Sequence, residues 1–295
     1  MKDKRVTKIP WNKSIWFFDI DDTLIDTAGT TLAASEGIRL VFKTKFGPKV
    51  AKKVQDNFNN IFNLMLRGHQ ARESHKTQEY EDLISKVESL QNRVKEKYGS
   101  FKKFSREVFI KIAADEAGLE TTPDLVHQAA EAYWLELTKK TEVFPGVISL
   151  ISEIQKHNRP IYLITSSDGR LKMDENGLFD YDPTFSEGFK RRRIELLRQK
   201  GIIFDAISIG DPEDKPHLDF FQKAIRIAQQ DYGSKLNLSN AIIVGDSYAG
   251  DLEVPKEKLG FGLSVLFHKT RSTTEINDSH QISTGDLSKI SDCLN

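Results

Sequence analysis

Five short apolar runs, each bounded by Gly, Asp or Pro, constrain the fold of this chain more than any other feature. They are rich in Ile and Val, and the later runs alternate with stretches of helical spacing. Such runs are typical of strands buried on both faces of a parallel sheet, with helices as crossovers. The runs are SIWFFDI (14–20), PIYLIT (160–165), DAISIG (205–210), AIIVGD (241–246) and LSVLFH (263–268), and the crossover helices include 147–157 and 218–230. The sequence therefore predicts an α/β fold with a doubly wound parallel sheet.

A long block between the first two runs contains no comparable run. Its apolar residues recur at helical spacing in three stripes, at 50–65, 80–94 and 125–137. The last stripe follows TTPD, which supplies a capping residue and a proline for a first helical turn. Such stripes are more typical of a buried core than of a cofactor site. Because 295 residues exceed one average domain, we expect a core of residues 1–27 and 143–295 and a smaller, all-helical domain of residues 28–142.

Composition excludes several classes of protein. The chain has 43 basic and 43 acidic residues, so its net charge gives no general attraction to nucleic acid or to an anionic membrane. No apolar run approaches membrane-spanning length, and the first one is too short for a signal sequence, which predicts a cytoplasmic protein. The single cysteine, Cys293, cannot form a disulfide or a thiolate metal site within one chain. Any metal must therefore use oxygen ligands. Nothing in the sequence specifies an oligomeric state.

Polar residues follow four of the predicted strands at their carboxyl ends, where the ligand site of an open parallel sheet lies. Carboxylates gathered there repel one another unless a cation lies among them, and hard oxygen ligands favour Mg²⁺. A hydroxyl and a lysine beside that cation would form a receptor for a phosphate. The polar residues are Asp19, Asp21 and Thr23; Thr165, Ser166 and Ser167; Asp211 and Lys215; and Asp246 and Asp251.

Four segments in order resemble the motifs of the haloacid dehalogenase superfamily, in its phosphatase branch. They are DIDDT (19–23), LITSS (163–167), KPHLDFF (215–221) and GDSYAGD (245–251). The third departs from the family pattern, because Leu218 replaces its second proline. The block at 28–142 matches the position and helicity of the family's first type of cap. The connection at 171–189 is longer than is usual in the family.

The resemblance and the placement of charge together imply a two-step hydrolysis of a phosphate ester. Asp19 is the nucleophile and forms an aspartyl-phosphate. Asp21 protonates the leaving alcohol and then accepts a proton from the attacking water. An aspartate at position 21 argues against dehalogenation, because the dehalogenase branch lacks it.

The remaining motif residues are expected to hold the metal and the phosphate. The resemblance implies that Mg²⁺ is bound by Asp19, Asp246 and the backbone carbonyl of Asp21. Thr165 and Lys215 are expected to stabilise charge on the transferring oxygens. Asp251 is expected outside the metal's ligand shell, where it orients a bound water or Lys215.

Other polar groups near the motifs have simpler interpretations. Asp22 and Asp26 are expected to be loop carboxylates, and Ser166 and Ser167 to be turn formers. The segment RGHQARESH (67–75) joins two helices of the inserted block, and Arg67, His69 and Arg72 are candidates for contact with an anionic substrate. A solvated turn is the simpler explanation of that loop. The run KRRR (190–193) suggests nucleic-acid binding, but Ile194, Leu196 and Leu197 follow it at helical spacing, which favours an exposed helix start.

These observations favour a Mg²⁺-dependent phosphatase for a small, soluble phosphomonoester, with no nucleic-acid or membrane partner. Two alternatives stay open. One is transfer of the phosphoryl group to a sugar hydroxyl, as in the mutases of the family. The other is a catalytically silent binding protein, which predicts a damaged motif, whereas all four motifs are intact. The substrate cannot be read from the inserted block.

Overall fold

The computed structural model describes residues 6, 8–70, 76–211, 213–232 and 236–294. The chain divides into two compact units. The first comprises Met1–Ala28, Glu142–Ser166 and Arg193–Asn295, and the second comprises Gly29–Thr141 and Ser167–Arg192.

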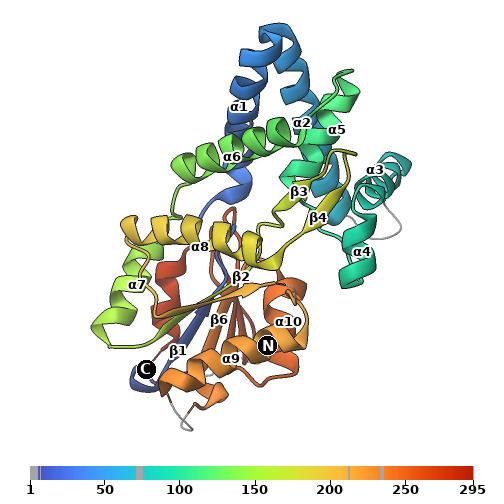
Figure 1. Cartoon of the computed structure of the whole chain (residues 1–295). Coiled ribbons are helices and arrows are strands. Elements are labelled where there is room, and N and C mark those ends of the chain that lie inside the picture. Colours follow the sequence, from blue (N-terminus) through green and yellow to red (C-terminus); the bar gives the residue numbers. More distant parts are fainter. Residues whose placement is uncertain (1–5, 7, 71–75, 212, 233–235, 295) are drawn as a thin grey trace. The chain divides into compact units, whose positions relative to one another are not determined.

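The first unit is built around a sheet that has seven strands within the described residues (Figure 1). Its order is β5–β2–β1–β6–β7–β9–β8, and all neighbours are parallel except β8, which is antiparallel to β9. All five predicted strands are confirmed; β8 and β9 were not predicted. The strands are β1 (Ile15–Phe18), β2 (Ile161–Ser166), β5 (Ala206–Gly210), β6 (Ala241–Gly245), β7 (Leu263–Phe267), β8 (Glu275–Asp278) and β9 (Gln281–Thr284).

Both faces of this sheet are covered, as the fully apolar strands predicted. Strand β1 sends Ile15 and Phe17 into one buried cluster, with side chains of α9 (Leu218–Tyr232) and α10 (Glu253–Glu257). It sends Trp16 and Phe18 into a second cluster, with side chains of α7 (Val147–Lys156), the end of α8 (Pro183–Gln199) and the 3₁₀-helix η6 (Leu287–Cys293). The doubly wound sheet is therefore confirmed, as are the crossover helices α7 and α9. Three short helical turns complete the unit: η1 (Trp11–Lys13), η4 (Leu238–Asn240) and η5 (Tyr248–Leu252).

The second unit is mainly helical. Its helix α6 begins as predicted, because the Thr122 side chain accepts a hydrogen bond from Leu125 N at 3.3 Å and Pro123 occupies the first turn. The stripe at 80–94 forms two helices instead of one. The chain breaks at the buried Gln91, whose side-chain amide pairs with both the N–H and the carbonyl of Lys102. The helices are α1 (Thr27–Phe46), α2 (Pro48–Gln70), α3 (Gln78–Ser89), α4 (Asn92–Tyr98), α5 (Arg106–Glu116) and α6 (Pro123–Lys140).

The compact units differ from the predicted domains in the segment Ser167–Arg192, which lies in the helical unit and not in the core. This segment forms an antiparallel hairpin of β3 (Leu171–Met173) and β4 (Phe179–Tyr181), so the second unit is not all-helical. Leu171, Phe179 and Tyr181 are buried in the apolar cluster of the helices. The buried Arg170 also forms ion pairs with Glu107 of α5, at 2.5 Å, and with Glu131 of α6. The segment joins the second unit because its apolar and charged partners lie there.

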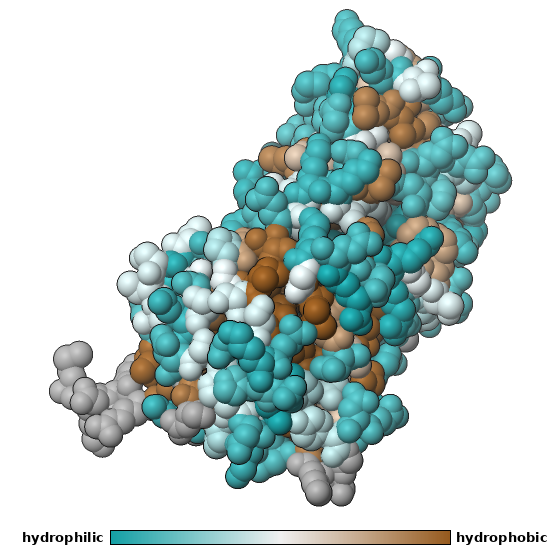
Figure 2. Space-filling view, turned by 90° about the vertical axis from the view of Figure 1, so that its left-hand side faces the viewer, coloured by the Kyte–Doolittle hydropathy of each residue, from teal (hydrophilic) through white to brown (hydrophobic). Residues whose placement is uncertain are grey.

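The face shown in Figure 2 is largely hydrophilic, with several hydrophobic areas. Exposed large apolar side chains include Ile148 of α7 and Ile203 in the first unit, and Leu32 of α1 and Leu135 of α6 in the second. In the part of the chain that the structure describes, no helix is both long and apolar enough to cross a membrane.

Candidate active site

Asp19 is fixed at the carboxyl end of β1, in the centre of the sheet. Its backbone N–H donates to the Val244 carbonyl at 2.9 Å, which continues the pairing of β1 with β6 one residue beyond the strand. The side chain is almost completely buried, and its Oδ2 accepts a hydrogen bond from Thr23 Oγ1 at 2.8 Å. The first motif thus supplies both the carboxylate and a hydroxyl that orients it.

Lys215 precedes α9 and reaches two carboxylates. Its Nζ lies 2.5 Å from Oδ1 of Asp19 and 2.6 Å from Oδ1 of Asp251. The lysine side chain is only 8% exposed, so these ion pairs are weakly screened by solvent. Burial alone would lower the pKa of Lys215, but the two carboxylates raise it overall. The lysine is therefore a fixed cation at the carboxyl end of β1.

The loop after β6 supplies Asp246 and Asp251. The turn η5 places Asp251 so that its Oδ2 accepts a hydrogen bond from Ser247 N at 3.0 Å. Strand β6 ends at Gly245, and a Cβ atom at this glycine would lie 2.4 Å from Cβ of Asp251. Only glycine leaves room for Asp251 there. One carboxylate oxygen from each of Asp19, Asp246 and Asp251 lies within 4.8 Å of the others.

This grouping perturbs the carboxylates strongly. Burial raises the pKa of Asp19 to about 7, against the lowering effect of Lys215, and the charge of Asp251 raises it further. Burial, followed by the charges of Asp19 and Asp251, raises the pKa of Asp246 to about 8. Within the described residues the Asp246 carboxylate receives no hydrogen bond. When Asp19, Asp246 and Asp251 are all ionised, Lys215 cannot balance their negative charge, because it is already shared between Asp19 and Asp251.

Asp21 does not belong to this group of three carboxylates and has other partners. Its Oδ1 accepts hydrogen bonds from Thr27 Oγ1 at 2.6 Å and from Arg193 Nη2 at 2.8 Å, and the same nitrogen lies 3.1 Å from Oδ2. The Asp21 side chain is 29% exposed, whereas that of Arg193 is 8% exposed. The sequence interpretation missed Arg193. A signal was present, because Lys190, Arg193, Ile194 and Leu197 share the helical spacing of one buried stripe.

A family model described as a haloacid dehalogenase-like hydrolase matches residues 15–257. The chain belongs to this family. No curated protein matches the chain. Similar solved structures have identities below 25% and therefore show the fold alone.

Three of these structures resemble the haloacid dehalogenase-like chain over nearly its whole length. A 2-haloacid dehalogenase from Pseudomonas syringae pv. Tomato DC3000 is 17% identical, with a TM-score of 0.53, over 95% of this chain and 97% of that chain. A HAD phosphatase from Thermococcus onnurineus is 14% identical, with a TM-score of 0.52, over 95% and 96%. The HAD-hydrolase YfnB from Bacillus subtilis, bound to magnesium, is 15% identical, with a TM-score of 0.51, over 94% and 96%.

The residues of this haloacid dehalogenase-like hydrolase fit a divalent cation. The donors of the cluster are all carboxylate oxygens, which suit a hard cation such as Mg²⁺. Asp246 offers a carboxylate that no described residue hydrogen-bonds. Both oxygens of Asp251, in contrast, already have partners in Lys215 and Ser247. The contacts thus suit Asp246 as a ligand and Asp251 as an outer residue, and both roles stay predictions.

Thr165 lies at the carboxyl end of β2, the neighbour of β1 in the sheet. It is completely buried, and its hydroxyl donates to the Ser166 carbonyl at 3.3 Å. Its contact with phosphate stays a prediction.

The contacts of the two loop carboxylates match their expected role. Asp22 has a left-handed φ of 61° and accepts a hydrogen bond from Ala28 N. Asp26 pairs with Lys269 at 3.0 Å. Burial raises the pKa of Asp22 to about 6.

The expected substrate loop is only partly described. Arg67 lies in α2 of the second unit, where it lines a pocket of about 470 Å³ with Asn60 and Glu79. His69 belongs to the same helix, and its side chain lies outside the described residues, as does Arg72 entirely. Contact of these residues with a substrate stays a prediction.

The run KRRR is not an exposed helix start, which corrects the sequence interpretation. It lies inside α8, and each of its cations has a partner within the chain. Lys190 is buried and pairs with Asp168 at 2.9 Å, and Arg193 pairs with Asp21. The other two lie at the surface, where Arg191 pairs with Glu187 and Arg192 stacks on the Phe189 ring.

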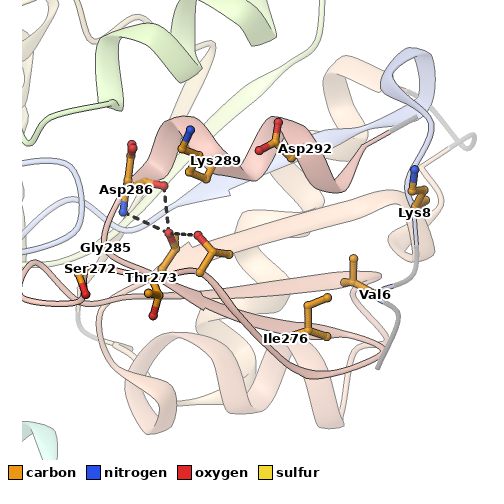
Figure 3. Close-up of a pocket in the computed structure, with 11 residues that line it drawn as sticks. Val6, Lys8, Ser272, Thr273, Ile276, Gly285, Asp286, Lys289 and Asp292 are labelled. Atoms are coloured by element: carbon orange, nitrogen blue, oxygen red, sulfur yellow. Dashed lines mark hydrogen bonds between the residues drawn. The ribbon is translucent and has the colours of Figure 1, made fainter. Parts of the chain in front are cut away.

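A separate pocket of about 730 Å³ lies beside β8 and β9, at the edge of the sheet (Figure 3). Lys8 and Lys289 line it, together with Asp286 and Asp292. The strand order separates this edge from β1 by β6 and β7. None of the predicted site residues lines this pocket.

Proposed function

We propose that this haloacid dehalogenase-like hydrolase is a Mg²⁺-dependent phosphatase that hydrolyses a small phosphomonoester through an aspartyl-phosphate on Asp19. The observation that carries the proposal is the pairing of Lys215 with Asp19, next to the Asp246 carboxylate. A buried carboxylate with an adjacent fixed cation can attack a phosphate only if the charge of that phosphate is also balanced. The carboxylate cluster offers a binding site for a divalent cation, which would supply this second positive charge.

Asp19 is suited to nucleophilic attack by its position and its contacts. Thr23 holds one of its oxygens and Lys215 holds the other, so the carboxylate has a fixed orientation. One carboxylate oxygen would form a bond to phosphorus as the bond from phosphorus to the leaving oxygen breaks. Water would then attack the aspartyl-phosphate, releasing inorganic phosphate and restoring Asp19.

Asp21 is suited to proton transfer because it is half-buried and lies two residues from the nucleophile. It would give a proton to the leaving alcohol in the first step and take one from water in the second. This role separates phosphate ester hydrolysis from dehalogenation, since a halide leaves without a proton.

The other motif residues would bind the charges of the reaction. Asp19, Asp246 and the backbone carbonyl of Asp21 would hold the Mg²⁺ ion, which supplies positive charge beside the nucleophile and the phosphate. Lys215 and Thr165 would contact oxygens of the transferring phosphoryl group. Asp251 would keep Lys215 in place.

The proposal is tested by assaying the purified full chain against a panel of phosphomonoesters, with Mg²⁺ and with EDTA. The panel should contain sugar phosphates, nucleoside monophosphates, phosphoglycolate and p-nitrophenyl phosphate, with 2-chloropropionate as the dehalogenation control. Release of phosphate that requires Mg²⁺ supports the proposal. Chloride release without phosphate release, or phosphate release that EDTA leaves unchanged, contradicts it.

A further inference from the structure

The side chain of Arg193 joins α8 to the loop that follows β1. Its Nη2 contacts both carboxylate oxygens of Asp21, a residue 172 positions earlier in the sequence. Both residues belong to the first compact unit. We propose that Arg193 is a positioning residue, which fixes the Asp21 carboxyl group in the orientation that proton transfer requires. This inference deepens the proposed function and rests on it.

Arg193 is itself fixed by the packing of its helix. The neighbouring Ile194 and the next-turn Leu197 are buried in the apolar cluster that contains Trp16 and Phe18 of β1. The segment of α8 that carries Arg193 is therefore anchored in the same packed core as β1, the strand that Asp19 follows. An arginine that has lost most of its solvent contact also loses little further freedom when it binds a carboxylate. Holding Asp21 in this orientation therefore requires no further loss of conformational entropy of Arg193 in each catalytic cycle.

Two donors converge on one oxygen of Asp21. Thr27 donates to Oδ1 at 2.6 Å, and Arg193 donates to the same atom at 2.8 Å. The longer contact of Arg193, at 3.1 Å, is to Oδ2. Together these contacts fix the orientation of the Asp21 carboxyl group. In the first step the O–H bond of the protonated carboxyl group breaks as the leaving oxygen takes the proton, and in the second step a proton from water returns to the carboxylate.

The same helix provides an internal comparison. Arg191 pairs with Glu187 at the surface of α8 and has a charge identical to that of Arg193. An Arg191→Met variant removes that charge two residues away and leaves the contact with Asp21 intact. It is therefore the matched control for Arg193→Met and for the conservative variant Arg193→Lys.

The kinetic test compares two esters in a single turnover, measured by rapid quench. Benzyl alcohol needs a proton in order to leave, whereas p-nitrophenolate leaves without one, so only the first reports on a general acid. We expect Arg193→Met to slow the release of benzyl alcohol about 10- to 100-fold, and that of p-nitrophenol by less than about threefold. The Arg193→Lys variant should recover part of the loss, Arg191→Met should match the wild-type protein, and KM should change little. An equal loss with both esters, or no loss with benzyl phosphate, overturns the inference.

A crystallographic comparison separates this inference from the proposed function. In Arg193→Met or Arg193→Lys crystals the Asp21 carboxylate should rotate away from its wild-type orientation, while in Arg191→Met crystals it should keep it. An unchanged Asp21 rotamer in the Arg193 variants overturns the positioning role, even if the protein is a phosphatase. A wild-type protein that releases phosphate from no ester overturns the proposed function, while the crystals still decide whether Arg193 positions Asp21. If Arg193→Met does not fold, Arg193→Lys carries both measurements.

Discussion

Lys215 lies between two buried carboxylates, with its Nζ 2.5 Å from Asp19 and 2.6 Å from Asp251. All three side chains are at most 8% exposed. Breaking a buried ion pair by removing one partner leaves a charge without compensation, which is strongly destabilising. The lysine is thus expected to support the fold as well as the chemistry.

Replacing Lys215 by Met should therefore destabilise the metal-free protein, by about 3–5 kcal/mol at pH 8. Lys215 lowers the pKa of Asp19, which is still about 7 because of burial. At pH 5 Asp19 is protonated with or without the lysine, so the substitution should lower the free energy of unfolding by less at pH 5 than at pH 8. Urea unfolding in EDTA at both pH values measures the difference, with the exposed Lys258→Met as the control. A loss that is the same at pH 5 and pH 8 would contradict this account.

The metal-free wild-type protein should lose stability as the pH rises from about 4 to about 8. The pKa values of Asp19 and Asp246 are raised to about 7 and about 8 in the folded chain, so the folded state binds more protons than the unfolded state in this window. Stability then falls as these protons are lost. Saturating Mg²⁺ should restore stability at pH 8, because it binds the ionised cluster of the folded state.

The Asp246→Asn variant provides the matching control for that experiment. It removes one half-buried negative charge from the carboxylate cluster, so thermal unfolding in EDTA should depend less on pH than in the wild-type protein. It should also lose most of the stabilisation by Mg²⁺ at pH 8. If Mg²⁺ stabilised this variant as much as the wild-type protein, Asp246 would not be a ligand.

Replacing Asp19 by Asn should reduce phosphate release from every ester to below about 0.1% of the wild-type rate, since no other residue replaces the nucleophile. The control is Asp26→Asn, a change of the same chemistry in the same loop. Asp26 pairs with Lys269 and is not part of the carboxylate cluster. Its variant should keep most of the activity. Equal activity of the two variants would show that Asp19 is not the nucleophile.

The sheet could be predicted from the sequence because its central strands are buried on both faces. Such strands are nearly continuous apolar runs, and the residues that end them lie at one edge of a parallel sheet. The positions of Asp19, Lys215, Asp246 and Asp251 follow from this rule together with the four motifs. Strand β8, in contrast, is the edge strand EIND, whose residues are largely exposed and carry no apolar pattern. Its formation depends on pairing with β9.

The contacts of charged residues were harder to predict. The hairpin formed by β3 and β4 has strands of three residues, and it belongs to the helical unit through the ion pairs of Arg170. The run KRRR has the composition of a basic surface, yet Lys190 and Arg193 are buried. The spacing of Arg193 relative to Leu197 indicates a buried position, but it does not name Asp21 as the partner. Pairing between residues far apart in the sequence needs the three-dimensional fold.

The Asp21→Asn variant separates the two proton transfers assigned to Asp21. With a sugar phosphate the variant should form the aspartyl-phosphate very slowly, because an alkoxide leaves poorly without a proton. With p-nitrophenyl phosphate the first step should be only mildly slowed, while hydrolysis of the intermediate still lacks its base. The enzyme should then accumulate in the phosphorylated form.

Rapid-quench measurement of this variant with p-nitrophenyl phosphate and Mg²⁺ tests the central claim most directly. The account predicts a rapid release of about one equivalent of p-nitrophenol per site, followed by slow turnover. After acid quench, mass spectrometry of proteolytic peptides should find one phosphoryl group on Asp19, removable by hydroxylamine. No burst, together with an unmodified Asp19 in a protein that still hydrolyses the ester, would contradict the account.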